Sequence, residues 1–465
     1  MSRLAQREPD VLVIGGGNAA LCAALAARRA GATVRVLERA PRAWRGGNSK
    51  YTRNIRCVNV GSDLMPGGYT DEELAADLEG VTGPGSDAML TGVAIERSRF
   101  APGWMESNGV RWQPALNGTL QLARTNRFFL GGGKALLNVY YNTAERLGIE
   151  VEYEHTVDGL EFDGARCTLV TVDSPEGRYE LRPRAVVAAA GGFQADIEWL
   201  RRYWGDAVDN FHIRGARQDD GLVLRLLIEA GALVRGNERG FHAIAVDARG
   251  PRFEGGIVTR VDSVPFSVML NRHGERFYDE GEDLWPKRYA VWGRLIATQP
   301  DQIAYSIYDS RMAGRFMSTA YRPYQAETVA GLAGPLELDP AVLTAAIDRY
   351  NAAVRPGTFD PTVLDDCHTE GLEPPKSHWA LPIDQPPFFA FALRPGITFT
   401  YLGVGVDGSA RVLRDQGGEL ENVFAAGEIM AGNILRRGYL AGFGMTIGTV
   451  FGRIAGEGAA AHAGS

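Results

Sequence analysis

The stretch VLVIGGGNAALCAALAARRAGATVRVLE, residues 11–38, decides the fold of this 465-residue chain. A short apolar run, a glycine turn, an Ala/Leu-rich segment and an alternating run predict strand, turn, helix and strand. Gly15, Gly17 and Ala20 match the G-x-G-x-x-[GA] pattern of dinucleotide sites. Glu38 ends the second strand, where a carboxylate can bind ribose hydroxyls and argues against the 2′-phosphate of NADP. The stretch therefore predicts a site for FAD or NAD.

The residues of this motif have separate tasks in such a site. Gly15 permits the tight turn, Gly17 lets the backbone approach a pyrophosphate, and Ala20 allows close packing of helix on strand. The helix N-terminus then offers amide donors and partial positive charge to the phosphates. We assign to the same site Asn18, Ala19 and Arg39.

Two later segments favour FAD over NAD. AVVAAAGGF (185–193) and NVFAAGEIMAGN (422–433) both look like a buried strand followed by glycines, and their order along the chain suits a return to one cofactor. Taken singly, each segment also fits an ordinary buried strand with a turn. From these segments we assign to the cofactor site Gly191, Gly192, Gly427 and Glu428.

Composition excludes several classes of protein. The net charge of −7 argues against general nucleic-acid binding, which needs a basic face. The four cysteines lie far apart without a C-x-x-C pair, which fits a reducing compartment and offers no zinc or iron–sulfur site. The seven histidines form no H-x-x-H or H-E-x-x-H pattern, so no metal site is predicted. The N-terminus resembles neither a signal peptide nor a membrane span, and we expect a cytoplasmic enzyme.

The segment WRGGNSKYTRNIR, residues 44–56, combines glycines, small polar groups and arginines. We expect Gly46, Gly47, Asn48 and Ser49 to lie against the cofactor, and Arg53 and Arg56 to face an anionic substrate. A second loop, LARTNRFFLGGGKAL, carries Arg124 and Arg127, which contact a carboxylate or are solvated surface charges. In RGARQDDG, residues 214–221, Asp220 is a helix cap beside the cofactor rather than a catalyst.

The amino-acid composition changes twice along the chain. From about residue 232 to 394, aromatic residues, prolines and mixed charges dominate, and the C-terminal part then returns to strand, glycine turn and small-residue helix. We therefore predict a cofactor-binding domain in residues 1–231 and 394–465, split by an inserted domain in residues 232–393. The fold class is α/β, and a helix capped by Asp339 is expected within residues 337–354.

Several long segments resemble the flavoprotein family of fumarate reductases, succinate dehydrogenases and 3-ketosteroid dehydrogenases. They are APRAWRGGNSKYTRNIR (40–56), NRHGERFYDEGEDLWPKRYAVWGR (271–294), RPGITFTYLGVGVD (394–407) and GYLAGFGMTIGTVFGRIAG (438–456). Within the family, FAD-dependent tricarballylate dehydrogenases are most similar. The resemblance implies a Rossmann-like FAD domain of the glutathione-reductase type, split by an α+β capping domain, with substrate between cap and flavin. It also implies FAD contacts by Glu428, Gly442 and Thr446.

The same resemblance implies catalytic residues in the cap. NRHGERFYDE matches the family signature N-x-x-G-x-R-F-x-x-E, after which an arginine donates or accepts the substrate proton. The insertion GEDLWPK precedes Arg288, on which we place that role, with Arg260 and Glu280 as partners in a proton relay. Where fumarate reductases carry a histidine pair, this chain has Thr398, Phe399 and Thr400.

A second part of the family's carboxylate-binding site also differs in this chain. The family's substrate-binding arginine is replaced by Tyr439, just after Arg436 and Arg437, so we expect these residues to bind substrate with Thr398 and Thr400. The histidine that some members bond covalently to flavin is not evident near GGNSKYT. We therefore expect FAD to be bound non-covalently.

These observations lead to one main functional hypothesis and two alternatives. The main one is an FAD-dependent dehydrogenase that oxidises a small polycarboxylate, tricarballylate to cis-aconitate, by hydride transfer to flavin N5 and proton abstraction by an arginine. Its electrons would pass to a separate acceptor, a membrane iron–sulfur protein. One alternative is a fumarate-reductase-like, ketosteroid or specialised-metabolite dehydrogenase acting on another carboxylated or carbonyl substrate. The other is a flavin-binding redox subunit without its own substrate. No oligomeric state is predicted.

Overall fold

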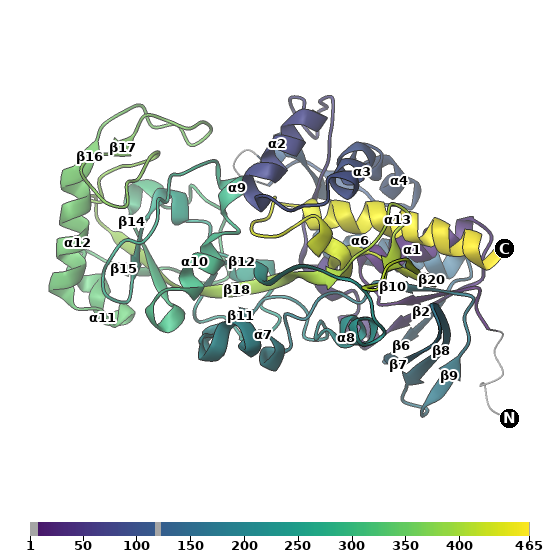
Figure 1. Cartoon of the computed structure of the whole chain (residues 1–465). Coiled ribbons are helices and arrows are strands. Elements are labelled where there is room, and N and C mark those ends of the chain that lie inside the picture. The colour runs from purple at the N-terminus through teal and green to yellow at the C-terminus, as the bar shows by residue number, and fades with distance from the viewer. Residues whose placement is uncertain (1–7, 117–121, 465) are drawn as a thin grey trace.

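The computed structural model describes residues 8–116 and 122–464. Its first sheet has the strand order β19–β20–β10–β1–β2–β6 and lies near the C-terminal helix in Figure 1. Neighbouring strands from β20 to β6 run parallel, while β19 is antiparallel to β20. The six strands are β1 (Val11–Ile14), β2 (Val34–Glu38), β6 (Glu150–Tyr153), β10 (Ala185–Ala188), β19 (Arg411–Leu413) and β20 (Glu419–Ala425). This parallel sheet confirms the predicted α/β class.

Two helices rich in small residues pack beside this sheet. α1 (Asn18–Arg29) follows the glycine turn, and α13 (Phe443–Gly464) ends the described chain. A Cβ added at Gly456 would lie only 2.2 Å from the carbonyl oxygen of Ala23 in α1. The glycines and alanines therefore let the two helix backbones approach one another directly, which holds the turn before α1 against the sheet.

We expect Gly456→Val to lower the melting temperature of the protein. The added side chain would meet the Ala23 backbone, and overpacking of a tight core contact costs about 1–3 kcal/mol. Thermal unfolding followed by circular dichroism measures the change. The matched control is Gly80→Val in α2 (Asp71–Thr82), because nothing lies within 4 Å of a Cβ added at Gly80. Equal melting temperatures for the two variants would contradict a close contact of α1 with α13.

The remaining elements of the cofactor-binding part surround the first sheet. The helices are α3 (Ala88–Ser98), α4 (Ala101–Ser107), α5 (Leu122–Thr125), α6 (Gly132–Arg146), α7 (Ile197–Trp204) and α8 (Leu222–Glu229). One small sheet contains β3 (Asn54–Arg56), β4 (Trp112–Gln113) and β5 (Asn126–Phe129). Another contains β7 (Thr156–Asp163), β8 (Arg166–Asp173) and β9 (Tyr179–Leu181).

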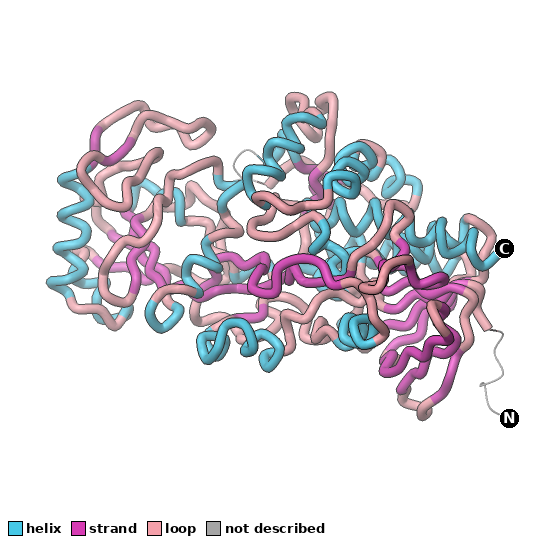
Figure 2. Tube along the Cα trace, in the orientation of Figure 1, coloured by secondary structure: helices cyan, strands magenta, loops and turns pink. Residues whose placement is uncertain are grey.

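One long strand joins the two ends of the molecule. β18 (Phe388–Val404) pairs at its start with β14 (Ala304–Asp309) and from Leu393 onward with β12 (Val234–Asp247). Figure 2 shows β12 and β18 as a band of strand that runs from the cap toward the first sheet. The sheet is completed by β11 (His212–Ile213), β13 (Val268–Asn271) and β15 (Tyr324–Ala326). The expected boundary between residues 393 and 394 thus falls inside a continuous strand.

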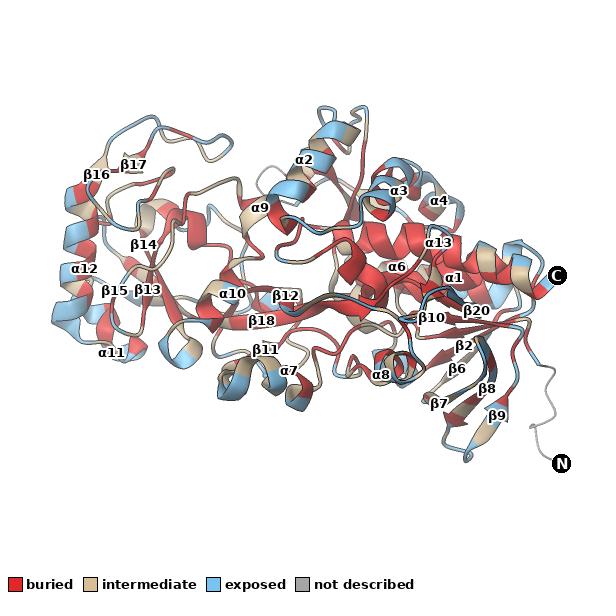
Figure 3. Ribbon diagram, in the orientation of Figure 1, coloured by how far each residue is buried: buried red, intermediate tan, exposed pale blue. Residues whose placement is uncertain are grey.

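The cap contains an apolar core of its own. Buried residues of β13, β14 and α12 (Pro340–Ala353) form it, and Figure 3 shows α12 with a buried inner and an exposed outer face. Asp339 Oδ1 accepts hydrogen bonds from Ala341 N at 2.7 Å and Val342 N at 3.1 Å, which confirms the predicted cap. The shorter helices are α9 (Trp285–Arg288), α10 (Trp292–Ala297) and α11 (Ala333–Leu336), and strands β16 (Val354–Arg355) and β17 (His368–Thr369) pair at the periphery. No helix in the described ranges is long and apolar enough to cross a membrane.

Candidate active site

A single elongated cavity gathers most of the predicted site residues. It begins at the carboxyl ends of β1, β2 and β10 and continues between β18 and the cap. The predicted cofactor residues that line it are Gly15, Gly17, Asn18, Ala19, Glu38, Arg39, Gly47, Asn48, Ser49, Gly191, Asp220, Gly427, Glu428 and Gly442. The predicted substrate or catalytic residues that line it are Arg53, Arg260, Thr398 and Tyr439. Ala20, Gly46, Gly192 and Thr446 are not among the lining residues.

The first end of the cavity is formed by the glycine turn before α1. Gly15 has a φ of +113°, and a Cβ there would lie 2.4 Å from the carbonyl oxygen of Ala189. The N-cap of α1 is Gly17, which has no side chain of its own to cap the helix. Asn18 N donates to Ser49 Oγ at 3.0 Å, which ties the helix to the loop of residues 46–49. This end therefore offers the uncrowded helix N-terminus that a pyrophosphate requires.

Glu38 stands at the end of β2 with both of its oxygens held by backbone amides. Ala40 N donates to Oε1 at 2.9 Å and Gly46 N to Oε2 at 3.0 Å. Burial raises the pKa of Glu38, which the backbone donors partly offset. Gly46 thus lies behind the cavity wall and positions the carboxylate. Arg39 pairs with Asp220 at 2.6 Å, and Asp220 Oδ1 accepts from the first amide of α8, Leu222 N, at 3.2 Å.

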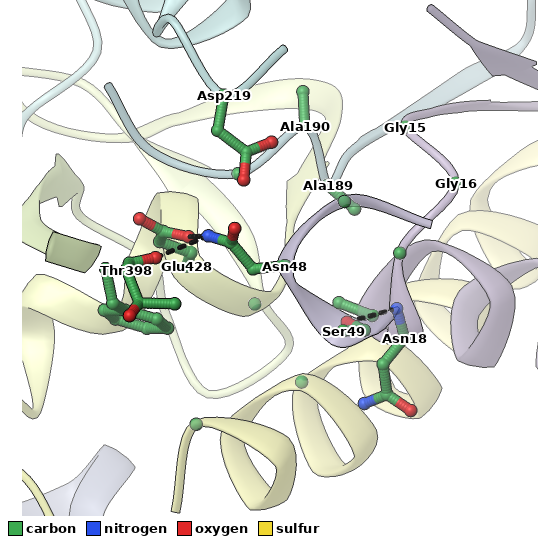
Figure 4. Close-up of a pocket in the computed structure, with 18 of the residues that line it drawn as sticks. Gly15, Gly16, Asn18, Asn48, Ser49, Ala189, Ala190, Asp219, Thr398 and Glu428 are labelled. Carbon is green, nitrogen blue, oxygen red and sulfur yellow. Dashed lines mark hydrogen bonds between the residues drawn. The ribbon is translucent and has the colours of Figure 1, made fainter. Parts of the chain in front are cut away.

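The middle of the cavity is organised by Asn48. Its Nδ2 donates to the carbonyl oxygen of Thr398 at 2.5 Å and to Glu428 Oε2 at 3.2 Å, while Oδ1 accepts from Ala216 N at 2.7 Å. Figure 4 shows Asn48 and Ser49 reaching from one loop toward Glu428 on one side and α1 on the other. Thr400 N donates to Glu428 Oε1 at 2.9 Å. Thr400 is therefore a support for Glu428, and its expected contact with substrate is corrected.

Three arginines line the far end of the cavity. Arg214 Nε and Nη2 donate to Thr398 Oγ1 at 2.9 and 2.6 Å, and its buried Nη1 finds no partner in the described ranges. Arg260 pairs with buried Asp262 at 2.5 Å and lies 4.2 Å from the centre of the Tyr289 ring. Arg53 donates to the sulfur of Met317 from the cap.

The charges of these arginines reinforce one another in a buried place. Burial, followed by the charge of Arg260, lowers the pKa of Arg53 to about 10. The same two causes lower the pKa of Arg214 to about 10. Like charges gathered away from water are costly unless an anion joins them. This end of the cavity is therefore built to receive an anion.

His242 also lines this end, although it belongs to no motif of the sequence. Its ring stacks on Tyr439 with centroids 4.0 Å apart, and its buried Nε2 finds no partner in the described ranges. Burial, then the charges of Arg214 and Arg260, holds the pKa of His242 well below its usual value, so the ring is neutral. His242 is brought here by its pairing with Phe399 in β18, far away in the sequence.

Two of the three catalytic residues assigned in the cap, Arg288 and Glu280, do not line the cavity. Arg288 Nε lies 3.2 Å from Glu282, and the next residue, Tyr289, lines the cavity instead. Glu280 Oε1 accepts from Met269 N at 2.8 Å, and Glu280 pairs with Arg276 at 2.5 Å. The insertion GEDLWPK ends in the short helix α9. Neighbouring residues of a helix point in different directions, so Tyr289 lines the cavity and Arg288 does not. We therefore correct the assignments of Arg288 and Glu280.

Five further arginines assigned to substrate lie outside the cavity, and these assignments are corrected too. Each contacts a neighbouring segment instead. Arg56 donates to Ala441 O and Tyr69 Oη, Arg124 pairs with Glu73, Arg127 pairs with Glu106, Arg436 donates to Gly85 O and Gly236 O, and Arg437 lies against Gly83. Thr446, assigned to the cofactor, donates to the carbonyl oxygen of Arg56.

A parallel sheet with a glycine turn before α1 and a carboxylate at the end of β2 defines a dinucleotide-binding protein. The model of the FAD binding domain family matches residues 10–442, and the chain belongs to that family. The uncapped helix N-terminus and the cavity that continues past it fit FAD, which this family binds. Within residues 8–116 and 122–464, no group of three His, Cys, Asp or Glu side chains is arranged to hold a metal.

Known proteins similar to the chain are reductases and dehydrogenases. It is 27% identical to the probable fumarate reductase Ifc3 of Shewanella frigidimarina, over 98% of the chain and 75% of the relative. It is 26% identical to urocanate reductase of Eggerthella lenta, again over 98% and 75%. The 3-ketosteroid-Δ4-(5α)-dehydrogenase of Rhodococcus jostii has the same fold, with a TM-score of 0.75, 23% identity and 98% of both chains covered. The chain is an FAD-dependent oxidoreductase of the FAD binding domain family.

Proposed function

We propose that the protein dehydrogenates a small polycarboxylate, with tricarballylate to cis-aconitate as the first candidate. The observation that carries this proposal is the group of three buried arginines, Arg53, Arg214 and Arg260, at the end of the cavity. Guanidinium groups bind carboxylates through paired, charge-assisted hydrogen bonds. A substrate with several carboxylates matches several guanidinium groups better than a neutral molecule does.

The residues around the arginines divide the work of the reaction. Arg214 is fixed by Thr398, so its free Nη1 is available to a carboxylate. Neutral His242 offers a further polar contact without adding charge. FAD, when bound, accepts the hydride that leaves the substrate. We place proton abstraction on Arg260: Asp262 takes a proton from the guanidinium, which then accepts the proton from the substrate carbon.

A second candidate function rests on the aromatic side chains at the arginine end of the cavity. Tyr289, Phe399 and Tyr439 line the cavity together, and such rings also suit a cyclic carbonyl substrate. The chain is 23% identical to 3-oxosteroid 1-dehydrogenase of Mycobacterium tuberculosis over 80% of its length. Against this candidate, an apolar ring system would leave three buried cations without an anion. A flavin-binding redox subunit without a substrate is the alternative of another class.

Anaerobic reduction of the bound FAD separates these functions. We expect mixing with tricarballylate to bleach the yellow absorbance of the holoenzyme, because the acid delivers a hydride to FAD. Succinate is the matched control, since it has the same reacting unit and one carboxylate fewer. Bleaching by a 3-oxosteroid alone would favour the second candidate. No bleaching by any carboxylate or steroid would favour the redox subunit and contradict the proposal.

We also propose that the protein is cytoplasmic. Once reduced, it would pass its electrons to a separate acceptor, a membrane iron–sulfur protein. The four cysteines are buried and form no disulfide, which fits a reducing compartment. Reoxidation of the bleached enzyme by purified iron–sulfur proteins, compared with reoxidation by dioxygen, tests this part.

A further inference from the structure

Two buried carboxyl groups line the same part of the FAD cavity. Asp219 lies in the loop before α8 and Glu428 directly after β20, and the two side chains are 6% and 9% exposed. Figure 4 shows both carboxyl groups pointing into the space next to Asn48. Two carboxylates in one buried space repel each other, so the protein must settle which of them keeps a proton.

The hydrogen bonds distinguish the two groups. Glu428 accepts from Thr400 N at 2.9 Å, Thr400 Oγ1 at 3.3 Å and Asn48 Nδ2 at 3.2 Å. Asp219 accepts at Oδ2 from Gln194 Nε2 at 3.0 Å, and no ion pair joins it to a lysine or arginine in the described ranges. Donors stabilise the charged form of a carboxyl group. Glu428 is therefore the member that ionises first, and Asp219 is the member that holds the proton.

The charges that face Asp219 favour the same assignment. Burial, then the negative charges of Glu428 and Glu38, raises the pKa of Asp219 well above its usual value, and Asp220 acts in the same direction. Lys50 is the cation that opposes them, but it also forms an ion pair with Glu254 at 3.5 Å. Tyr51, nearby, is uncharged because burial raises its own pKa. Burial also raises the pKa of Glu428, to about 8, so the negative charge of Glu428 acts on Asp219 in the alkaline range.

The Oδ1 atom of Asp219 faces two glycines of the cofactor site. A Cβ added at Gly191 would lie 2.9 Å from Oδ1, and one added at Gly47 would lie 3.7 Å from it. The missing side chains keep this face of the carboxyl group open to the cavity. We propose that Asp219 meets bound FAD as an uncharged carboxylic acid and donates a hydrogen bond to it, so that FAD binds together with one proton.

This coupling makes the affinity for FAD depend on pH in a defined direction. Below the pKa of Asp219 the affinity is constant, because the acid is already protonated. Above it, binding must first take up a proton, and the affinity falls about tenfold per pH unit. An ionised Asp219 would also repel the negatively charged pyrophosphate of FAD.

The first test is titration of the apoprotein with FAD, followed by flavin fluorescence, over a range of alkaline pH. We expect the affinity of the wild type to fall with pH and that of Asp219→Asn to remain level, since an amide donates without titrating. The matched control is Asp206→Asn, because Asp206 is 98% exposed and pairs with Arg201 on the surface. This control should keep the wild-type slope. A level wild-type affinity, or the same slope in Asp219→Asn, would overturn the proposal.

The second test locates the proton directly and does not depend on the stability of Asp219→Asn. Infrared spectra of the holoenzyme should contain the carbonyl band of a buried protonated carboxyl group. In Glu428→Gln the band should persist in acid, but as pH rises it should disappear at a lower pH than in the wild type, because loss of the Glu428 charge lowers the pKa of Asp219. Loss of the band in Glu428→Gln at every pH would place the proton on Glu428 and reject the assignment.

Discussion

Replacing Arg260 by alanine should abolish reduction of FAD by substrate while FAD remains bound. Arg260 lies at the arginine end of the cavity, paired with Asp262 and packed on Tyr289, and not among the groups around the glycine turn. Loss of a proton-transfer group costs about 10²–10⁴-fold in rate. Loss of a charge that stabilises the developing carbanion costs about 10²–10³-fold more. We therefore expect no measurable bleaching on the time scale of the wild-type reaction.

Stopped-flow absorbance under anaerobic conditions measures this effect, and the ratio of flavin to protein absorbance verifies that FAD is retained. Arg288→Ala in the same experiment distinguishes the two arginines that the sequence allows. Because Arg288 pairs with Glu282 outside the cavity, this variant should reduce FAD at nearly the wild-type rate. A fast Arg260→Ala enzyme together with a slow Arg288→Ala enzyme would return the catalytic role to Arg288.

The FAD half of the site was predictable because its signals are local in the sequence. The turn around Gly15 and Gly17 and the carboxylate of Glu38 belong to one strand–helix–strand unit, whose geometry hardly varies. Asn48 and Ser49 follow soon after, in a loop rich in glycine. In each case the residue type itself is required, by a positive φ, a close approach or a fixed hydrogen bond.

The substrate half was only partly predictable because it depends on pairings between distant segments. Arg214 and His242 reach the cavity through the contacts of β11 and β12 with β18, about 160–180 residues away. Arg214 begins the segment RGARQDDG, but that segment points to the helix cap Asp220, and His242 lies in no motif. Positive charge alone did not identify the substrate-binding residues. Arg124 and Arg127 lie on a loop that was expected to bind a carboxylate, but each forms an ion pair with an acidic side chain of a neighbouring helix. The short helix α9 decides whether Arg288 or Tyr289 faces inward.

Replacing Arg214 by methionine should weaken substrate binding strongly without changing the shape of the site. Methionine fills a similar volume but removes the charge and the donors to Thr398. Truncating a buried partner of a hydrogen-bonded charge pair costs about 2–5 kcal/mol, which is roughly thirtyfold or more in affinity. The measurement is the KM for the acid that bleaches the wild-type enzyme. The control is Arg217→Met, because Arg217 is exposed on the same loop and packs on Phe253.

The same variant should acquire a pH dependence that the wild type lacks. His242 is neutral in the wild type because burial and the charges of Arg214 and Arg260 depress its pKa. Without Arg214 one of these causes disappears and the pKa of His242 rises, although burial, the largest cause, still holds it below its usual value. As pH falls through the raised pKa, the imidazolium restores part of the lost positive charge, so the affinity for a carboxylate should recover in acid. A KM for Arg214→Met that stays high and level as pH falls would show that His242 does not face the bound anion.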